Sequence, residues 1–213
     1  MLKLYYANIR LIKDNQVFDA LLEKVNIQRR EKVLRCKQEN DRRRSLLAGY
    51  LLRVALETEG MVYDDISFAT EKNGKPVLNQ VSNLYFSLSH AGDYAVCLIS
   101  DYCVGVDIET KSRAVFTQDE RMEAIARKIL NNEEYKQFLE GPKEEKDELF
   151  LQFWTRKECY SKADGRGLGI ELNQIKTDGD GFYSKWLDDE TFLSMYVEDG
   201  DYQDLQIEEI KYV

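Results

Sequence analysis

Residues 104–110 read VGVDIET and place an apolar residue at every second position. This alternation is typical of a β-strand with one buried face. Asp107 and Glu109 lie on the opposite face, about 7 Å apart at roughly 3.3 Å of rise per residue. The strand therefore carries two carboxylates side by side.

Two carboxylates on one face repel each other, and each costs several kcal/mol if it loses water without gaining a partner. Either this face is solvated or a cation neutralises the pair. Oxygen ligands favour a hard ion, and Mg²⁺ typically takes one or two carboxylates together with substrate phosphates. The stretch alone leaves both interpretations open.

The composition limits the class of protein. The chain has 213 residues, of which 43% are hydrophobic and 32% charged, as expected of one large or two small soluble domains. Its first residues lack the apolar core of a signal peptide, and its longest apolar run is far short of the ~20 residues that a membrane span needs. The four cysteines fit neither a metal-site spacing nor a disulfide framework, so we expect a reducing cytoplasm and no membrane contact.

Charge is distributed unevenly along the chain. The net charge of −9 argues against a general nucleic-acid binder. However, residues 28–44 hold eight basic and three acidic side chains, whereas residues 178–209 hold eleven acidic ones and a single lysine. A local basic patch on an acidic protein suits a small polyanion, and the alternative is two solvated helix faces.

The order of predicted elements indicates an α+β fold. A first strand is followed by helices at about 19–36 and 39–58 and then by short strands up to 110. Helices return at about 118–139 and 146–164, and further strands follow. This order predicts two similar halves, 1–103 and 104–213, although direct similarity between them is too faint to prove a repeat.

A second informative stretch is FWTRKECYSKADGRGLG at 153–169. On a helix, Trp154, Glu158 and Lys162 form one stripe, with Lys157 at its edge. The stripe is either a surface Glu–Lys pair beside a buried tryptophan, or a site with Glu158 as oxygen ligand or general base and Lys162 facing a phosphate. Three glycines follow and allow the backbone to turn sharply.

The chain's single histidine, His90, ends a predicted strand beside Ser89. A lone histidine is either a structural residue or, at a loop rim, a donor to a phosphate. No Ser/His/Asp arrangement stands out, and one histidine cannot supply a multi-histidine zinc site.

Together these elements resemble the surfactin-synthetase-activator type of 4′-phosphopantetheinyl transferase. The family signature is G-x-D-x-E and, some fifty residues later, W-x-x-K-E-x-x-x-K. It is matched here by Gly105, Asp107, Glu109, Trp154, Lys157, Glu158 and Lys162. The upstream segments RREK, RRRSLLAGYLLR, NGKP and FSLSH also resemble the family, so the likeness extends from about residue 25 to 172.

The resemblance implies two similar α/β subdomains in a pseudo-twofold arrangement, with the active site in the cleft between them. Residues 1–103 would hold the 3′-phosphate and adenine side of coenzyme A, and 104–213 the Mg²⁺ and the catalytic residues. The implied reaction transfers the phosphopantetheine arm of coenzyme A to a serine of an apo acyl or peptidyl carrier protein and releases 3′,5′-ADP.

The resemblance also implies a role for each matched residue. Asp107, Glu109 and Glu158 would hold Mg²⁺, and Glu158, Lys162 and Asp107 would be catalytic, with Glu158 as base for the serine. The implied coenzyme A ligands are Arg29, Lys32, Arg44 and Ser45 at the 3′-phosphate, Lys75 near the adenine or its phosphates, and Ser89, His90, Lys157 and Lys162 at other phosphates.

Three positions depart from the family pattern or are ambiguous. Arg29 stands where lysine is frequent, and a guanidinium fork is not equivalent to an ammonium. Ala91 stands where serine is common, which removes one hydroxyl. Glu133 or Glu134 corresponds to a family glutamate near the site, and its role stays open.

Two other functions remain as alternatives. One is a coenzyme A-binding module without catalysis, and the other is a Mg²⁺-dependent phosphohydrolase of coenzyme A-like nucleotides. We expect a monomer that binds coenzyme A and an apo carrier protein. The type of carrier stays open, but we expect it to contact residues 111–135 through Val115, Phe116, Met122 and Ile125.

Overall fold

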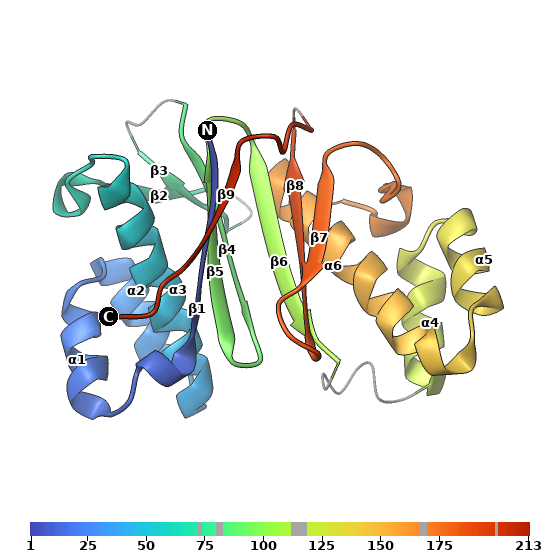
Figure 1. Cartoon of the computed structure of the whole chain (residues 1–213), viewed down its shortest axis with the longest axis horizontal. Coiled ribbons are helices and arrows are strands. Elements are labelled where there is room, and N and C mark those ends of the chain that lie inside the picture. The colour runs from blue at the N-terminus through green and yellow to red at the C-terminus, as the bar shows by residue number, and fades with distance from the viewer. Residues whose placement is uncertain (72–73, 80–82, 112–118, 167–169, 199) are drawn as a thin grey trace.

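The computed structural model of the chain describes residues 1–71, 74–79, 83–111, 119–166, 170–198 and 200–213. The predicted α+β class is confirmed, because helices cover two sheets that lie together in the middle of the molecule (Figure 1). The predicted carrier contacts Val115 and Phe116, part of the NGKP segment and two of the three glycines lie outside the described residues.

The first sheet has the strand order β4-β5-β1-β9. Its strands are β1 (Leu2–Asn8), β4 (Tyr85–Ala91), β5 (Tyr94–Ser100) and β9 (Leu205–Glu209). The second sheet, β6-β8-β7, consists of β6 (Val104–Thr110), β7 (Phe182–Trp186) and β8 (Thr191–Val197). A short hairpin joins β2 (Phe68–Thr70) and β3 (Pro76–Leu78).

Helices lie at the two ends of the molecule, outside the sheets (Figure 1). Those on the first sheet are α1 (Asn15–Glu23), α2 (Ile27–Arg35) and α3 (Glu39–Thr58), and those on the side of the second sheet are α4 (Asp119–Ile129), α5 (Asn132–Glu140) and α6 (Lys146–Asp164). Single 3₁₀ turns are η1 (Ile9–Leu11), η2 (Tyr63–Asp65), η3 (Lys143–Glu145) and η5 (Leu172–Gln174).

Asparagine caps divide two segments that the sequence pattern predicts as single helices. The predicted helix 19–36 is α1 followed by α2, because the Asn26 side chain accepts a hydrogen bond from the Arg29 amide and begins a new helix. The predicted helix 118–139 is divided in the same way by Asn131, which forms a capping box with Glu134.

The two sheets share an apolar core. In β1, Leu2 and Leu4 face the second sheet, whereas Tyr5 and Ala7 face the helices of the first half. In β6, the three alternating apolar residues pack into the core between the sheets. The molecule therefore has four layers, with helices outside and two sheets inside.

The last strand connects the predicted halves. β9 pairs in parallel with β1, so the end of the chain extends the sheet that begins with its first residues. The boundary between residues 103 and 104 falls between β5 and β6, but β9 returns across it. The division into 1–103 and 104–213 stays a prediction.

Strands β4 and β6 meet through serine side chains. The amides of Val106 and Ile108 donate to the hydroxyls of Ser87 (3.0 Å) and Ser89 (3.3 Å). β6 is the outer strand of its sheet, so these two amides have no strand partner of their own. The serine oxygens satisfy them and hold β4 against β6.

Gly105 allows α6 to lie directly on β6. A Cβ atom at this position would stand 1.8 Å from the carbonyl oxygen of Cys159 and 2.7 Å from the amide nitrogen of Ala163, both on the backbone of α6. Any side chain would push the helix away from the strand. The glycine of the G-x-D-x-E stretch is thus a packing requirement.

We therefore expect Gly105→Ala to lower the free energy of unfolding by about 3 kcal/mol or more, because the methyl group meets backbone that cannot rotate away. Urea denaturation measures this loss. Gly179→Ala is the matched control, since a Cβ there meets nothing within 4 Å, and we expect a change within about 0.5 kcal/mol. Similar stabilities of the two variants would contradict this account of the helix–strand contact.

Candidate active site

A cavity of about 550 Å³ is lined by residues from both predicted halves. This volume is within the usual range of small-molecule sites, roughly 300–1,000 Å³. Among its described lining residues, four carry positive charge (Arg29, Lys32, Lys75 and Lys162) and one, Glu158, carries negative charge. His90, Ser87 and Ser89 also line it. The cavity therefore favours an anionic ligand.

Asp107 is the buried acidic centre beside this cavity. It is 5% exposed, so the solvated interpretation of this position is wrong. Its Oδ1 accepts hydrogen bonds from the Lys162 ammonium (2.7 Å) and from the Ser89 hydroxyl (2.9 Å). The neutralising cation in this structure is thus an ammonium group from α6.

Lys162 spans the contact between α6 and β6. Besides Asp107, its ammonium donates to the Ser89 hydroxyl (2.9 Å) and to the carbonyl oxygen of Val106 (3.0 Å). The Ser89 hydroxyl therefore contacts β6 twice and α6 once. Through this serine, the first half of the chain holds the ion pair of the second half in place.

The oxygen donors expected for Mg²⁺ lie on two adjacent elements. Asp107 and Glu109 are on β6, and Glu158 is on α6, which packs against that strand. The Asp107 Oδ2 atom is buried and has no hydrogen-bond partner among the described residues. Such an oxygen is costly to bury and is suited to a hard cation.

The trio is not assembled as the side chains stand. Within the part of the chain that the structure describes, no three His, Cys, Asp or Glu side chains lie close enough to hold a metal ion. The Glu109 carboxylate accepts a hydrogen bond from the indole nitrogen of Trp154 (3.3 Å). The donor set fits Mg²⁺ chemically, and its closing around an ion stays a prediction.

Helix α2 brings Arg29 and Lys32 to the cavity. The Arg29 side chain crosses α3 at Gly49, where a Cβ atom would stand 2.5 Å from Arg29 Cγ. Burial lowers the pKa of Arg29, which remains a cation at neutral pH. Sequence inspection missed Gly49, but a glycine inside a strongly helical segment costs about 1 kcal/mol and indicates a packing role.

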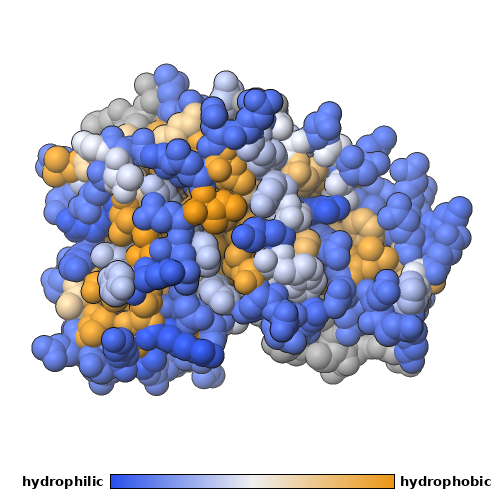
Figure 2. Space-filling view, in the orientation of Figure 1, coloured by the Kyte–Doolittle hydropathy of each residue, from blue (hydrophilic) through white to orange (hydrophobic). Residues whose placement is uncertain are grey.

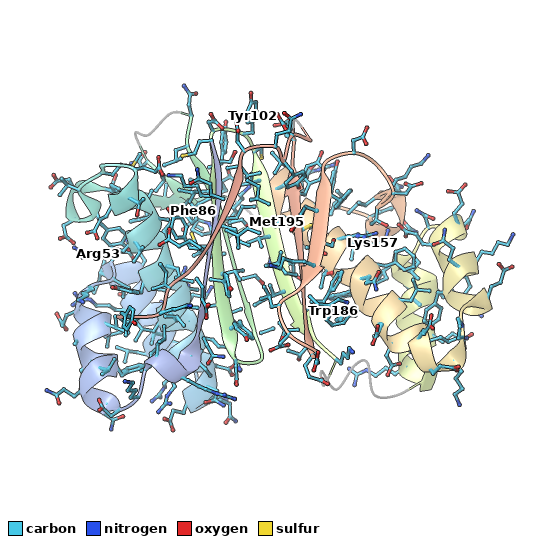
Figure 3. All side chains as sticks on the ribbon, in the orientation of Figure 1. Arg53, Phe86, Tyr102, Lys157, Trp186 and Met195 are labelled. Atoms are coloured by element: carbon cyan, nitrogen blue, oxygen red, sulfur yellow. The ribbon has the colours of Figure 1, made fainter. Side chains whose placement is uncertain are left out.

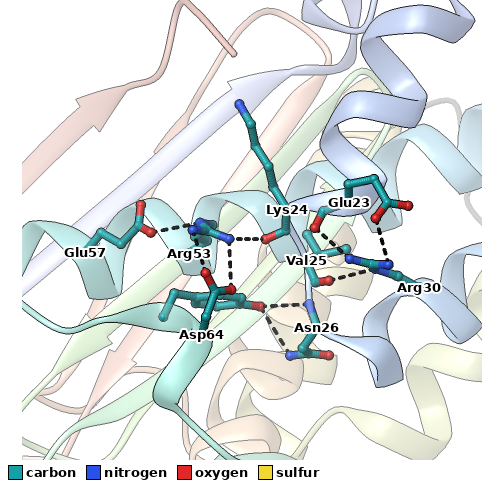
Figure 4. A network of polar contacts seen from close by, with 9 residues as sticks. Glu23, Lys24, Val25, Asn26, Arg30, Arg53, Glu57 and Asp64 are labelled. Carbon is teal, nitrogen blue, oxygen red and sulfur yellow. Dashed lines mark hydrogen bonds and ion pairs between the residues drawn. The ribbon is translucent and has the colours of Figure 1, made fainter.

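A polar network fixes α2 on α3 (Figure 4). The Arg53 guanidinium bonds Glu57, Asp64 and the carbonyl oxygen of Lys24. Arg30 donates to the carbonyl oxygens of Glu23 and Val25. These contacts hold the turn before α2 and therefore the angle at which its basic residues enter the cavity.

Lys75 and Gly165 line the cavity near the end of α6. The Lys75 ammonium donates to the carbonyl oxygen of Ala163 (2.9 Å), near the end of α6. Gly165 follows the helix with φ +78°, the left-handed conformation that glycine adopts without strain. This position performs the sharp turn expected of the first of the three glycines.

Arg44 and Ser45 do not line the cavity. The Arg44 guanidinium donates to the carbonyl oxygen of Gly92 (2.6 Å) and pairs with Asp41. The Ser45 hydroxyl is buried without a hydrogen-bond partner among the described residues. Their contact with a 3′-phosphate stays a prediction that requires Arg44 to leave Asp41.

The prediction for Lys157 as a phosphate ligand is wrong. Its side chain is fully buried, and its ammonium pairs with Glu134 (2.7 Å) and donates to the carbonyl oxygens of Leu172 and Ile175. Figure 3 shows Lys157 among the helices of the second half, apart from Phe86, which lines the cavity. Helical spacing alone could not tell which face α6 turns inward.

Glu134 joins three segments of the second half. Besides Lys157, it accepts hydrogen bonds from the Asn131 amide and from the Thr177 hydroxyl. Glu134 is buried and has a structural role, whereas Glu133 is exposed. Which of the two corresponds to the family glutamate stays open. One predicted carrier contact also needs correction, because Met122 is 2% exposed and belongs to the core.

No helix in the described ranges is both long and apolar enough to cross a membrane. Hydrophilic residues cover most of the helical ends on the face shown in Figure 2, and apolar side chains form separate patches between them.

Comparison with known proteins gives the family. The model of the 4′-phosphopantetheinyl transferase superfamily matches residues 103–208, and that of the 4′-phosphopantetheinyl transferase N-terminal domain matches residues 13–102. The chain therefore belongs to the 4′-phosphopantetheinyl transferase superfamily and is of the type represented by Sfp.

Individual relatives match different lengths of the chain. The chain is 35% identical to 4′-phosphopantetheinyl transferase psf-1 of Bacillus pumilus over 63% of this chain and 55% of that protein. It is 28% identical to Sfp of Bacillus subtilis over 71% of this chain and 65% of Sfp. A further 4′-phosphopantetheinyl transferase of Bacillus subtilis is 27% identical over 87% of this chain and 82% of that protein. The chain thus spans between about half and two thirds of the first two relatives.

The Lys157–Glu134 pair gives a test of its structural role. We expect Lys157→Met to lower the free energy of unfolding by about 3–5 kcal/mol, because it leaves the Glu134 charge buried alone. Coenzyme A affinity of the folded variant should stay within about twofold of that of the unchanged protein. Lys136→Met is the control: its exposed pair with Glu140 (3.9 Å) is worth under about 0.5 kcal/mol. A stable Lys157→Met protein that had lost coenzyme A binding would restore the original prediction.

His90 provides a pH test. Burial, followed by the charges of Lys32 and Arg44, lowers its pKa to about 4. Between pH ~6.5 and 4, the unfolded histidine binds a proton that the folded one refuses, so stability falls as pH falls. Urea denaturation at pH 7 and 4.5 should show that the unchanged protein loses about 2–3 kcal/mol more than His90→Gln. Equal losses would exclude a partly buried His90 that stays neutral.

Proposed function

We propose that this chain transfers the 4′-phosphopantetheine arm of coenzyme A to a serine of an apo acyl or peptidyl carrier protein, with Mg²⁺. The observation that carries the proposal is the cavity beside the Asp107–Lys162 pair in a member of this superfamily. Its described lining residues include four cationic side chains and one carboxylate. Part of the proposal is that the two halves are related by a pseudo-twofold axis and that this cavity is the cleft between them.

Charge complementarity supports coenzyme A as the ligand. Its three phosphate groups carry negative charge at both ends of the nucleotide, and the cationic side chains come from separate elements: α2, the β2–β3 hairpin region and α6. Arg29 and Lys32 would contact the 3′-phosphate side. Lys162, which lies beside Asp107, would contact the diphosphate.

Asp107, Glu109 and Glu158 would hold the Mg²⁺. The ion, when bound, would neutralise charge on the diphosphate and so assist loss of the 3′,5′-ADP leaving group. This role accounts for the Asp107 Oδ2 atom, which has no hydrogen-bond partner in the part of the chain that the structure describes.

The chain's own residues would accept the serine proton and contact the phosphate oxygens. Glu158 lines the cavity and would accept the proton of the carrier serine as the new oxygen–phosphorus bond forms and the bond to 3′,5′-ADP breaks. The Lys162 ammonium would donate to a phosphate oxygen and stabilise the charge that develops there. Neutral His90 can donate one hydrogen bond to a phosphate without adding charge.

Hydrolysis of coenzyme A is the rival reaction, with water in place of the serine. Mass spectrometry separates the two functions when the protein is incubated with coenzyme A, Mg²⁺ and an apo carrier protein. Transfer adds the phosphopantetheine mass to the carrier, whereas hydrolysis releases free phosphopantetheine even without a carrier.

Glu158→Gln separates chemistry from binding. We expect it to lower the transfer rate at least 100-fold, because the amide cannot accept the serine proton, and to leave coenzyme A affinity within a few fold by calorimetry. Glu133→Gln makes the same chemical change on α5, away from the cavity, and should keep full activity. Full transfer by Glu158→Gln would remove Glu158 from the base role.

A further inference from the structure

Lys162 is paired with the carboxylate that the proposed metal ion also needs. Its ammonium lies 2.7 Å from Asp107 Oδ1, and two further hydrogen bonds, to Ser89 and to the Val106 carbonyl oxygen, complete its coordination. All three donors of the ammonium are satisfied in this ligand-free arrangement. The carboxylate it contacts is 5% exposed and is the central predicted metal ligand.

The Lys162–Asp107 pair satisfies only one of the two carboxylate oxygens. Asp107 Oδ1 is bonded twice, whereas Oδ2 has no partner among the described residues. A single ammonium thus stabilises a carboxylate that still has an unused oxygen. The ammonium neutralises the buried charge of Asp107 but leaves one carboxylate oxygen without a donor. That oxygen can still accept a further partner, such as a metal ion.

A divalent ion on Asp107 Oδ2 and the Lys162 ammonium on Oδ1 would lie within a few ångströms of each other, and their repulsion is weakly screened beside a carboxylate that is only 5% exposed. The Lys162 side chain is 31% exposed and also lines the cavity, so its ammonium can rotate from Asp107 towards a ligand there. An anionic diphosphate in the cavity would offer it a replacement partner.

We propose that Lys162 is the internal counter-ion of Asp107 in the ligand-free protein and keeps divalent metal off that carboxylate until coenzyme A draws the ammonium onto a phosphate. This inference rests on the proposed function. Metal and coenzyme A then bind cooperatively, and by linkage each raises the affinity for the other by the same factor.

Mn²⁺ is the probe, since the free ion is counted directly by electron paramagnetic resonance. Titrations of the full chain with Mn²⁺ alone and with saturating coenzyme A compare the unchanged protein with Lys162→Gln. The glutamine amide can still donate to Asp107 but carries no charge. Lys75→Gln is the matched control: it removes one positive charge from the same cavity, but Lys75 donates to a carbonyl oxygen and forms no ion pair with a carboxylate within the described residues.

For the unchanged protein, we expect coenzyme A to tighten Mn²⁺ binding at least tenfold. In Lys162→Gln, Mn²⁺ alone should bind at least tenfold tighter than in the unchanged protein, and coenzyme A should add much less. Lys75→Gln should bind Mn²⁺ alone within about threefold of the unchanged protein.

Equal Mn²⁺ affinities in the unchanged protein and Lys162→Gln would overturn the inference. A rise in Mn²⁺ affinity in Lys75→Gln as large as that in Lys162→Gln would also overturn it, because any lost positive charge in the cavity would then have the same effect. Failure of the proposed function looks different: coenzyme A would produce no calorimetric binding signal in the unchanged protein. In that case, the affinities of the unchanged protein and Lys162→Gln for Mn²⁺ alone still test the counter-ion role of Lys162.

Thermal melting gives a second measurement if Lys162→Gln is poorly folded. Without its counter-ion, Asp107 destabilises the fold, so Mn²⁺ should raise the melting temperature of Lys162→Gln more than that of the unchanged protein. The double variant Asp107→Asn/Lys162→Gln removes both charges and should regain stability without responding to Mn²⁺. A double variant no more stable than Lys162→Gln would contradict the pairing.

Discussion

The ion pair between Lys162 and Asp107 lies where three elements converge, and the arrangement of the site depends on it. β6 supplies the carboxylate, α6 supplies the ammonium, and β4 supplies the Ser89 hydroxyl that bonds both. The pair can form only because α6 lies on β6 at Gly105, where no side chain fits. Two segments about fifty residues apart in the sequence therefore meet at the buried Asp107 carboxylate.

Two lysines on the same helix show how packing assigns roles. Lys157 is fully buried and uses its ammonium to join α6 to Glu134 and to the segment after the helix. Lys162 lies more than one turn further on and is exposed enough to reach the cavity. The first stabilises the position of the helix, and the second is the one for which we propose an exchange of partners. Chemically identical side chains on one helix thus have different surroundings.

Much of the fold and part of the site could be predicted from the sequence. The strand 104–110, the helix carrying Glu158 and Lys162 and the α+β class follow from local periodicity, which local backbone geometry enforces. The breaks at Asn26 and Asn131 were also accessible, because asparagine is a strong N-cap residue. They were missed because the apolar pattern continues across both positions.

Other features depend on contacts between distant segments and leave little trace in a single sequence. The parallel pairing of β9 with β1 joins the two ends of the chain, and no local pattern specifies such a partner. The burial of Lys157 and of Met122 depends on which helix face turns inward. The passage of Arg29 over Gly49 has a weak signal, a glycine in a strong helix, that only the packing explains.

The most direct test of the central claim is a crystal structure with coenzyme A and Mn²⁺ bound, using the anomalous signal of manganese to locate the metal. The account predicts one strong peak within coordination distance of the Asp107 carboxylate, the diphosphate in the cavity lined by Arg29, Lys32 and Lys75, and the Lys162 ammonium moved from Asp107 to a phosphate oxygen. A nucleotide bound in this cavity with Lys162 still on Asp107 and no manganese beside that carboxylate would contradict it.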